Sequence, residues 1–195
     1  AFFTRMLADI EQPTAPFGLV AMNRDGSDFV EHRATLPQAL SDRLRAHART
    51  LGVSVASIMH LAWAMMLSRA TGLDRVVFGT VLFGRMDGGH GADRALGLYI
   101  NTLPIRVDLD AGIGAGDAVR NTHRAVAELL RHEHASLAVA QRCSAVPASV
   151  PLFTSLFNYL YAADASLSET DVRVEDVEGG ERTNYPLSIS AIDSG

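Results

Sequence analysis

Residues 76–85 read VVFGTVLFGR, residues 97–106 read GLYINTLPIR, and the segment between them is rich in glycine. Nearly continuous β-branched and aromatic residues in the first run are typical of a strand covered on both faces. We therefore predict strands at Asp74–Phe83 and Leu98–Leu109, joined by a loop at Gly84–Gly97. Pro104 cannot donate to a strand ladder, which favours an edge strand or a bulge at that point.

Helical and strand patterns alternate on both sides of this stretch. Residues 1–35 have no regular pattern, so we expect an irregular segment ahead of a domain that starts near Leu36. The alternation predicts an α/β fold in which a mixed sheet packs against helices. The expected helices are 37–51, capped by Gly52; Val55–Leu67, capped by Ser54 and buried; Asp117–Glu133; and Ser136–Arg142. The other expected strands are Leu152–Tyr161, Val172–Val177 and Tyr185–Ile192, the last two joined at Gly179-Gly180.

Composition excludes several classes of function. All 17 basic residues are Arg, so the chain alone cannot form a phosphate-binding Gly-Lys loop, a pyridoxal Schiff base or a kinase site. The net charge of −5 argues against a nucleic-acid partner, and no apolar run approaches the length of a membrane span. Cys143 has no partner for an internal disulfide, which fits a cytoplasmic location. We expect it to be a half-buried structural thiol.

Seven histidines suggest a metal site, but their spacing argues against one. His132 and His134 are two residues apart and would point to different sides of a helix, unlike a His-Glu-x-x-His pair. His60 lies within a helix predicted to be buried, where a hydrogen-bonded core histidine is the favoured interpretation. No Gly-x-Ser-x-Gly elbow of a serine hydrolase is present. We therefore expect no metal site in this chain.

Asn101 and Thr102 are polar residues within an apolar strand. A buried polar group without a hydrogen-bond partner costs about 1–3 kcal/mol, so the pair needs partners. Either it braces the backbone near Pro104, or it faces a polar channel. The residues alone favour the bracing role.

The stretch 97–106 resembles the Gly-x-Phe-x-Asn-Thr-x-x-x-Arg motif of condensation domains from nonribosomal peptide synthetases. Residues 78–85 are similar to the strand and Gly-Arg turn that precede this motif in the family. Residues 132–137 and 151–153 lie where two further motifs belong, although both depart from the usual residues. Residues 183–190 and 2–19 also resemble family segments, so the resemblance follows the family's order along almost the whole chain.

The resemblance implies a lobe of the chloramphenicol acetyltransferase-like fold, in which two lobes enclose a tunnel. Residues 1–35 would be the inter-lobe segment and residues 36–195 a C-terminal lobe, truncated at its C-terminal end. The family's His-His-x-x-x-Asp-Gly motif belongs to the N-terminal lobe, and this chain contains no His-His pair. We therefore expect an amide-bond-forming acyltransferase whose isolated C-terminal lobe is inactive. The residues implied for the tunnel wall are Asn101, Thr102, Gly84, Arg85 and Tyr99, with Arg106 and Pro104 in structural roles.

The partners implied by the resemblance are the donor and acceptor peptidyl carrier domains, the N-terminal lobe and an adjacent adenylation domain. No cofactor would bind directly, because the substrates arrive on the phosphopantetheine arms of the carriers. Three other interpretations stay open: an epimerisation domain, a stand-alone acyltransferase of the same superfamily, and a non-catalytic docking domain for carrier proteins. The Asn101-Thr102 pair argues against epimerisation, whose counterpart motif usually lacks it.

Overall fold

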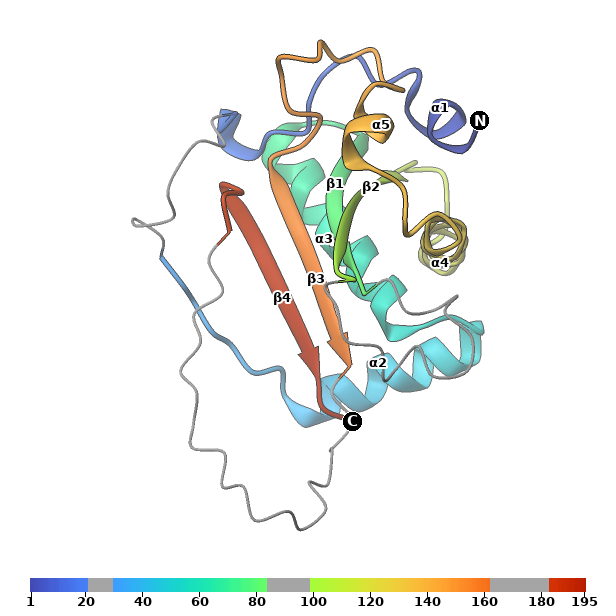
Figure 1. The fold of residues 1–195 in the computed structure, drawn as a ribbon. Helices are drawn as coiled ribbons and strands as arrows, with labels where there is room; N and C mark the ends of the chain where they lie inside the picture. The colour runs from blue at the N-terminus through green and yellow to red at the C-terminus, as the bar shows by residue number, and fades with distance from the viewer. Residues whose placement is uncertain (21–29, 84–98, 162–182) are drawn as a thin grey trace.

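The computed structural model describes residues 1–20, 30–83, 99–161 and 183–195 (Figure 1). In this part of the chain, four strands form one mixed sheet in the order β2-β1-β3-β4. β1 pairs antiparallel with β2 and parallel with β3, and β3 pairs parallel with β4. The predicted α/β class with a mixed sheet is therefore confirmed. The strands are β1 Arg75–Leu82, β2 Asn101–Asp108, β3 Ser155–Tyr161 and β4 Leu187–Asp193.

Helices pack against one face of this sheet. α3 runs behind β1 and β3 in Figure 1, and α4 lies beside α3 and against β2. His60 of α3 contacts Thr80 of β1 and the ring of Phe157 of β3, which defines the α3 face of the sheet. The helices are α1 Phe2–Leu7, α2 Gln38–Leu51, α3 Val55–Thr71, α4 Ala115–Leu130 and α5 Leu137–Gln141, with a 3-10 turn at Pro16–Gly18.

The other face of the sheet, here called the second face, carries the alternate side chains. On β1 these belong to Val77, Gly79 and Val81. A methyl group at Gly79 would lie 3.0 Å from Thr102 and 3.1 Å from Leu156, so these two side chains share the second face. Val76 to Thr80 are all buried. The prediction that β1 is covered on both faces is confirmed.

The helix ends follow the sequence signals. Gly52 ends α2 with a φ of 66°, in the left-handed region that glycine adopts without steric cost. Ser54 caps α3, because its hydroxyl accepts a hydrogen bond from the backbone N–H of Ser57. β2 is an edge strand of the described sheet, and Pro104 pairs with Gly79 in an unbroken register. Of the two alternatives predicted from Pro104, an edge strand or a bulge, the described sheet shows the edge strand.

The N-terminal segment differs from the expectation. Residues 1–35 were expected to be irregular, but Phe2–Leu7 form a helix, and Phe3, Leu7 and Ile10 are buried in the same core as the sheet. The prediction was wrong here because so short a helix shows no clear periodicity and is held by its tertiary contacts. α4 ends at Leu130, three residues earlier than expected. The predicted loop at 84–97, the strand at 172–177 and the turn at 179–180 lie outside the described residues.

No single helix within the described ranges is long and apolar enough to cross a membrane. α2 and α3 meet that requirement only as a pair bent by 107°.

His60 joins α3 to the middle of the sheet. Its Nδ1–H donates to the carbonyl of Ala56 at 2.7 Å, so the neutral ring accepts the hydroxyl of Thr80 at Nε2, 2.9 Å away. The residue is 4% exposed, which confirms the predicted hydrogen-bonded core histidine. Burial lowers the pKa of His60 from 6.5 to about 4, although the bond to Ala56 acts in the opposite direction.

The buried neutral state of His60 predicts acid sensitivity. The unfolded chain takes up a proton on this residue near pH 6.5, whereas the folded chain does so only near pH 4. Stability from this residue is therefore complete above pH 6.5 and is lost as the pH falls toward 4, by about 3 kcal/mol in all. Urea unfolding between pH 7 and 4 should show a smaller loss for His60→Gln than for the parent. The control variant His47→Gln, at an exposed histidine, should lose as much free energy of unfolding as the parent. Equal losses in all three proteins would contradict the prediction.

Candidate functional site

The predicted site residues lie at the start of the edge strand β2. Asn101 and Thr102 are its first two residues, and Tyr99, which precedes it, is 39% exposed. Gly84 and Arg85, also predicted for this site, lie outside the described residues. Asn101 and Thr102 are half-buried, and their side chains point to opposite faces of the sheet.

Asn101 connects β2 to the loop that follows α4. Its Nδ2 donates to the backbone carbonyls of Glu133 at 2.7 Å and Ala135 at 2.8 Å. Its Oδ1 accepts the N–H of Thr102 at 2.9 Å. The amide group thus satisfies two carbonyls of a segment with no regular secondary structure and one N–H at the strand end. Asn101 acts as a brace between β2 and the α4–α5 loop.

Thr102 lies on the second face, beside the point where Phe153, which precedes β3, approaches Gly79 of β1. A Cβ atom at Gly79 would lie 2.5 Å from Cε2 of Phe153, so only glycine fits at this position of β1. The ring of Phe153 stacks on Tyr185, with centroids 5.8 Å apart and planes at 5°. The ring of Phe153 therefore covers the second face at Gly79, and its stack on Tyr185 joins the approaches to β3 and β4.

A row of four side chains, three of them polar, crosses the second face next to Phe153. Thr102 pairs with Val81 between β2 and β1, and Asn158 pairs with Ser190 between β3 and β4. The β1–β3 ladder pairs Thr80 with Phe157, so Val81 lies beside Asn158 in the same row. We call these four residues the Thr102–Ser190 row. Ser190 is exposed, whereas Asn158 is only 8% exposed.

Arg106 is held by carboxylates at the other end of β2. Its guanidinium contacts Asp108 at 2.7 Å and Asp9 at 2.5 Å, and it donates to the carbonyl of Met6 at 3.0 Å. Partial burial disfavours the charged guanidinium, but the two carboxylates outweigh it and raise the pKa of Arg106. The hydrogen bond from Arg106 lowers the pKa of Asp9. These contacts tie β2 to the end of α1.

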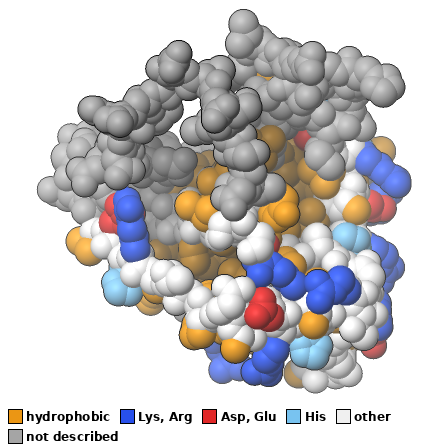
Figure 2. Space-filling model, turned by 90° about the horizontal axis from the view of Figure 1, so that it is seen from below, with side chains coloured by type: hydrophobic (Ala, Val, Ile, Leu, Met, Phe, Trp, Pro, Cys, Tyr) orange, Lys and Arg blue, Asp and Glu red, His pale blue; other side chains and the backbone are white. Residues whose placement is uncertain are grey.

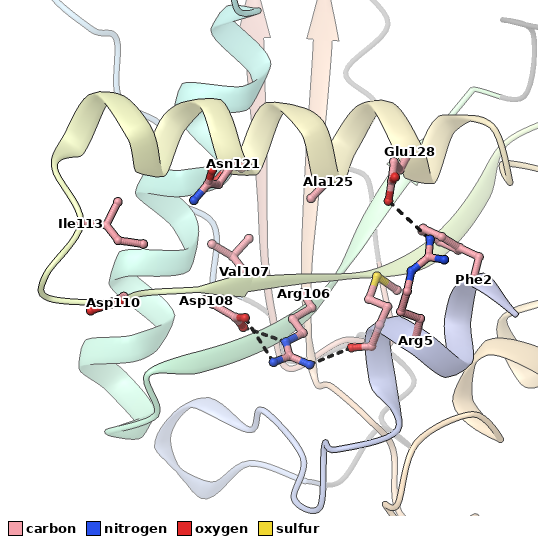
Figure 3. A pocket seen from close by; sticks show the side chains of 12 residues that line it. Phe2, Arg5, Arg106, Val107, Asp108, Asp110, Ile113, Asn121, Ala125 and Glu128 are labelled. Atoms are coloured by element: carbon pink, nitrogen blue, oxygen red, sulfur yellow. Dashed lines mark hydrogen bonds and ion pairs between the residues drawn. The ribbon is translucent and has the colours of Figure 1, made fainter.

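A groove of about 580 Å³ lies between α1, the end of β2 and α4. In Figure 3, α4 crosses above β2 and Arg106 lies below the strand, paired with Asp108. Arg5 faces Glu128 at 3.9 Å on the other side. Arg5, Arg106, Asp108 and Glu128 of this groove are paired with one another, whereas Asp110 is exposed and its carboxylate accepts the backbone N–H of Gly112.

A second groove, of about 520 Å³, lies next to α2 at the C-terminal ends of β3 and β4. Here Asp193 of β4 is paired with Arg45 of α2 and accepts the hydroxyl of Tyr159 at 2.7 Å. Arg45 and then Tyr159 lower the pKa of Asp193, while burial and the bond to Asp193 raise the pKa of Tyr159. The molecule seen from below has apolar side chains at the centre of this view and arginines beside them (Figure 2). Tyr161 and Ile192, at the strand ends, are 66% and 70% exposed.

The histidines and the cysteine have ordinary contacts. His132 stacks on Phe2, with centroids 4.1 Å apart, and His134 is largely exposed. The part of the chain that the structure describes contains no group of three His, Cys, Asp or Glu side chains that could hold a metal ion. Cys143 is half-buried, as predicted, and donates to the carbonyl of Val139 at 3.4 Å.

Sequence reasoning missed Gly79, Phe153 and Asn158 as neighbours of the predicted site. Asn158 was placed within an aromatic-rich strand, but its alignment with Thr102 depends on the pairing of three strands. The signal that could have indicated it is a single amide within the apolar run LFNYLY, residues 156–161.

Comparison with known proteins identifies relatives along the whole chain. A model of the family described as "Condensation domain" matches residues 11–195. The chain is 52% identical over 195 residues to Malpibaldin synthetase of Mortierella alpina, covering all of this chain and 4% of that protein. It is 32% identical over 155 residues to Bacitracin synthase 3 of Bacillus licheniformis, covering 78% of this chain and 2% of that protein. The chain thus spans only a few per cent of these relatives.

Two solved structures share the fold. The condensation domain from the Monacolin K polyketide synthase MokA superposes with a TM-score of 0.74 at 20% identity, covering 99% of this chain and 48% of that one. The X-domain from teicoplanin biosynthesis superposes with a TM-score of 0.70 at 21% identity, covering 98% of this chain and 44% of that one. The predicted fold of condensation domains is therefore confirmed.

Removing the Asn101 brace should destabilise the chain. Asn101→Ala leaves the carbonyls of Glu133 and Ala135 without their donor, so we expect the free energy of unfolding to fall by about 1–3 kcal/mol. Asn101→Asp should cost more, because it places a carboxylate oxygen against two carbonyl oxygens. Urea unfolding followed by circular dichroism measures both. Asn121→Ala, at an exposed amide of α4, is the control and should change stability by less than about 0.5 kcal/mol; equal effects at 101 and 121 would refute the brace.

A side chain at Gly79 should disrupt the second face. Gly79→Ala places a methyl group against the stacked ring of Phe153, and we expect a loss of about 1–3 kcal/mol from overpacking. Gly116→Ala, within helix α4, is the matched control. Its methyl group would lie 3.6 Å from Leu51 of α2, an ordinary van der Waals contact. That control should be neutral or stabilising by up to about 1 kcal/mol. Thermal unfolding separates the two variants, and an unchanged Tm for Gly79→Ala would contradict the packing argument.

Proposed function

The chain belongs to the condensation-domain family, and we propose that it is the C-terminal lobe of a domain that forms peptide bonds in nonribosomal peptide synthesis. In this proposal the lobe supplies one wall of the space in which two carrier-bound thioesters react. The single observation that carries it is the family match over residues 11–195, with the Asn101–Thr102 motif at the start of edge strand β2.

The proposed reaction is an acyl transfer between two carriers. The amine of the acceptor attacks the thioester carbonyl carbon of the donor; a C–N bond forms, the C–S bond breaks, the amine loses a proton and the thiol leaves. Holding the two reactive ends together can contribute up to about 7–11 kcal/mol in well-oriented systems. A rigid wall is therefore a substantial part of such a catalyst, even without a catalytic residue of its own.

Two observations support the assignment to one lobe. The chain matches 48% of the length of one condensation domain of known structure, about half of it. It also contains no His-His pair, the family's catalytic signature. We propose that the histidine acting on the attacking amine comes from the N-terminal lobe, and that this lobe alone is inactive.

The wall residues have different proposed roles. Asn101 is a positioning residue that acts through its brace, because its Nδ2 is engaged by the carbonyls of Glu133 and Ala135. Thr102, on the second face, is proposed to line the wall, together with Tyr99, Gly84 and Arg85. Pro104 and Arg106 hold β2 at the sheet edge.

The proposed partners follow from the chemistry. A donor and an acceptor carrier domain deliver the thioesters on phosphopantetheine arms, and an adenylation domain next to this domain supplies the activated amino acid. The relatives are synthetases of which this chain spans a small part, which favours such a multidomain setting. We propose a cytoplasmic location for the assembly.

The test uses the two-lobed domain that contains this chain, together with loaded donor and acceptor carriers. The whole domain should form the peptide product, whereas the chain of residues 1–195 alone should form none. Asn101→Ala in the whole domain should reduce turnover about tenfold or more, because a displaced wall misaligns the reacting ends. Mass spectrometry of the carrier-bound product measures this, with Asn121→Ala as the control. Product from the isolated chain, or none from the whole domain, would overturn the proposal.

A further inference from the structure

The side chain of Asn158 has an acceptor that nothing in the described structure satisfies. Its Oδ1 is buried and has no hydrogen-bond partner. The residue as a whole is 8% exposed. An unsatisfied buried amide oxygen is destabilising by an amount comparable to a whole hydrogen bond, and native proteins retain few of them. An orphaned amide of this kind favours a partner that arrives with a ligand.

Asn158 lies where a ligand of the proposed site would pass. It shares the Thr102–Ser190 row with Thr102, the proposed wall residue on β2, and Val81 lies between the two. On its other side Ser190 is exposed on β4, so the row reaches the surface there. The ring of Phe153 lies beside the Thr102 end of the row, over Gly79. Asn158 is therefore the buried polar group in the middle of a row that begins at the predicted wall and ends at the surface.

A primary amide has a specific complement. It offers one carbonyl oxygen and two N–H donors, and it can pair with another amide in both directions. Because the oxygen and nitrogen of an asparagine can exchange places by rotation, the group accepts an N–H or donates to a C=O as the ligand requires. Carrier-bound substrates contain secondary amides, both in the pantetheine arm and in a peptidyl chain. Such an amide matches the orphaned group in size and in hydrogen bonding.

We propose that Asn158 is a substrate-positioning residue that hydrogen-bonds a secondary amide of a carrier-bound thioester lying across the Thr102–Ser190 row. This inference rests on the proposed function and adds to it a contact on β3. It assigns Asn158 to substrate binding, in contrast to Asn101, which acts through the backbone of the α4–α5 loop. Asn158 supplies orientation and takes no proton in the reaction.

Asn158→Leu in the two-lobed domain tests the contact, because leucine has a similar size and no acceptor. A ligand contact predicts a rise of about fivefold to tenfold in KM for one carrier-bound substrate, with kcat changed less than twofold, as expected for the loss of one neutral hydrogen bond. It also predicts an unchanged or raised Tm, because an unsatisfied oxygen is removed from the interior. A purely structural role predicts the reverse, with a lower Tm and an unchanged KM, and would overturn the inference.

Ser155→Ala is the matched control. Ser155 lies on the same strand, is fully buried and also has a hydroxyl without a hydrogen-bond partner, but it belongs to the α3 face. Its variant should keep the KM values of the parent. If Ser155→Ala raises KM as much as Asn158→Leu does, the effect belongs to the strand and the inference fails. If the parent domain forms no peptide at all, the proposed function fails instead.

The source of the amide is resolved by comparing two donors. An aminoacyl donor carries secondary amides only in the pantetheine arm, whereas a dipeptidyl donor also carries one in the acyl chain. Equal KM increases for both donors assign the contact to the arm. An increase confined to the dipeptidyl donor assigns it to the peptide. An increase for the acceptor alone assigns it to the acceptor's arm, and no increase for any of the three overturns the inference.

Discussion

The burial of β1 on both faces is the constraint on which the rest of the structure depends. On the α3 face, His60 bonds Thr80 and keeps a polar helix residue satisfied inside the core. On the second face, the absence of a side chain at Gly79 lets the ring of Phe153 lie directly on the strand. β2 and β3 pair with the two edges of β1, so the positions of both are set by how β1 is packed.

The proposed wall is assembled from segments that are far apart in the chain. Asn101 connects β2 to a loop more than thirty positions later. The stack of Phe153 on Tyr185 joins the approaches to β3 and β4, and the ring of Phe153 lies over Gly79. At the opposite end of β2, Arg106 forms an ion pair with Asp9, which follows α1 in the chain. Asn101 and Arg106 thus restrain the two ends of the strand that carries the family motif.

Two buried polar side chains, His60 of α3 and Asn158 of β3, differ in how the cost of their burial is met. His60 is neutral and fully bonded, so it stabilises the α3 face at the pH of the cell and loses that effect in acid. Asn158 is nearly as buried, yet its oxygen has no partner in the described structure. His60 is therefore satisfied within the fold, whereas we propose a ligand as the partner of Asn158.

The sequence alone determined the class of the fold, the caps of α2 and α3 and the family, and at Pro104 it limited β2 to an edge strand or a strand with a bulge. Those features depend on local periodicity, on the backbone freedom of Gly52 and the missing N–H of Pro104, or on motif order along the chain. The tertiary structure alone decided that α1 is helical, that Asn101 braces the α4–α5 loop, and that Asn158 lies in line with Thr102. These last features depend on contacts between distant segments and on strand register, and a one-residue shift in register would turn Asn158 to the other face of the sheet.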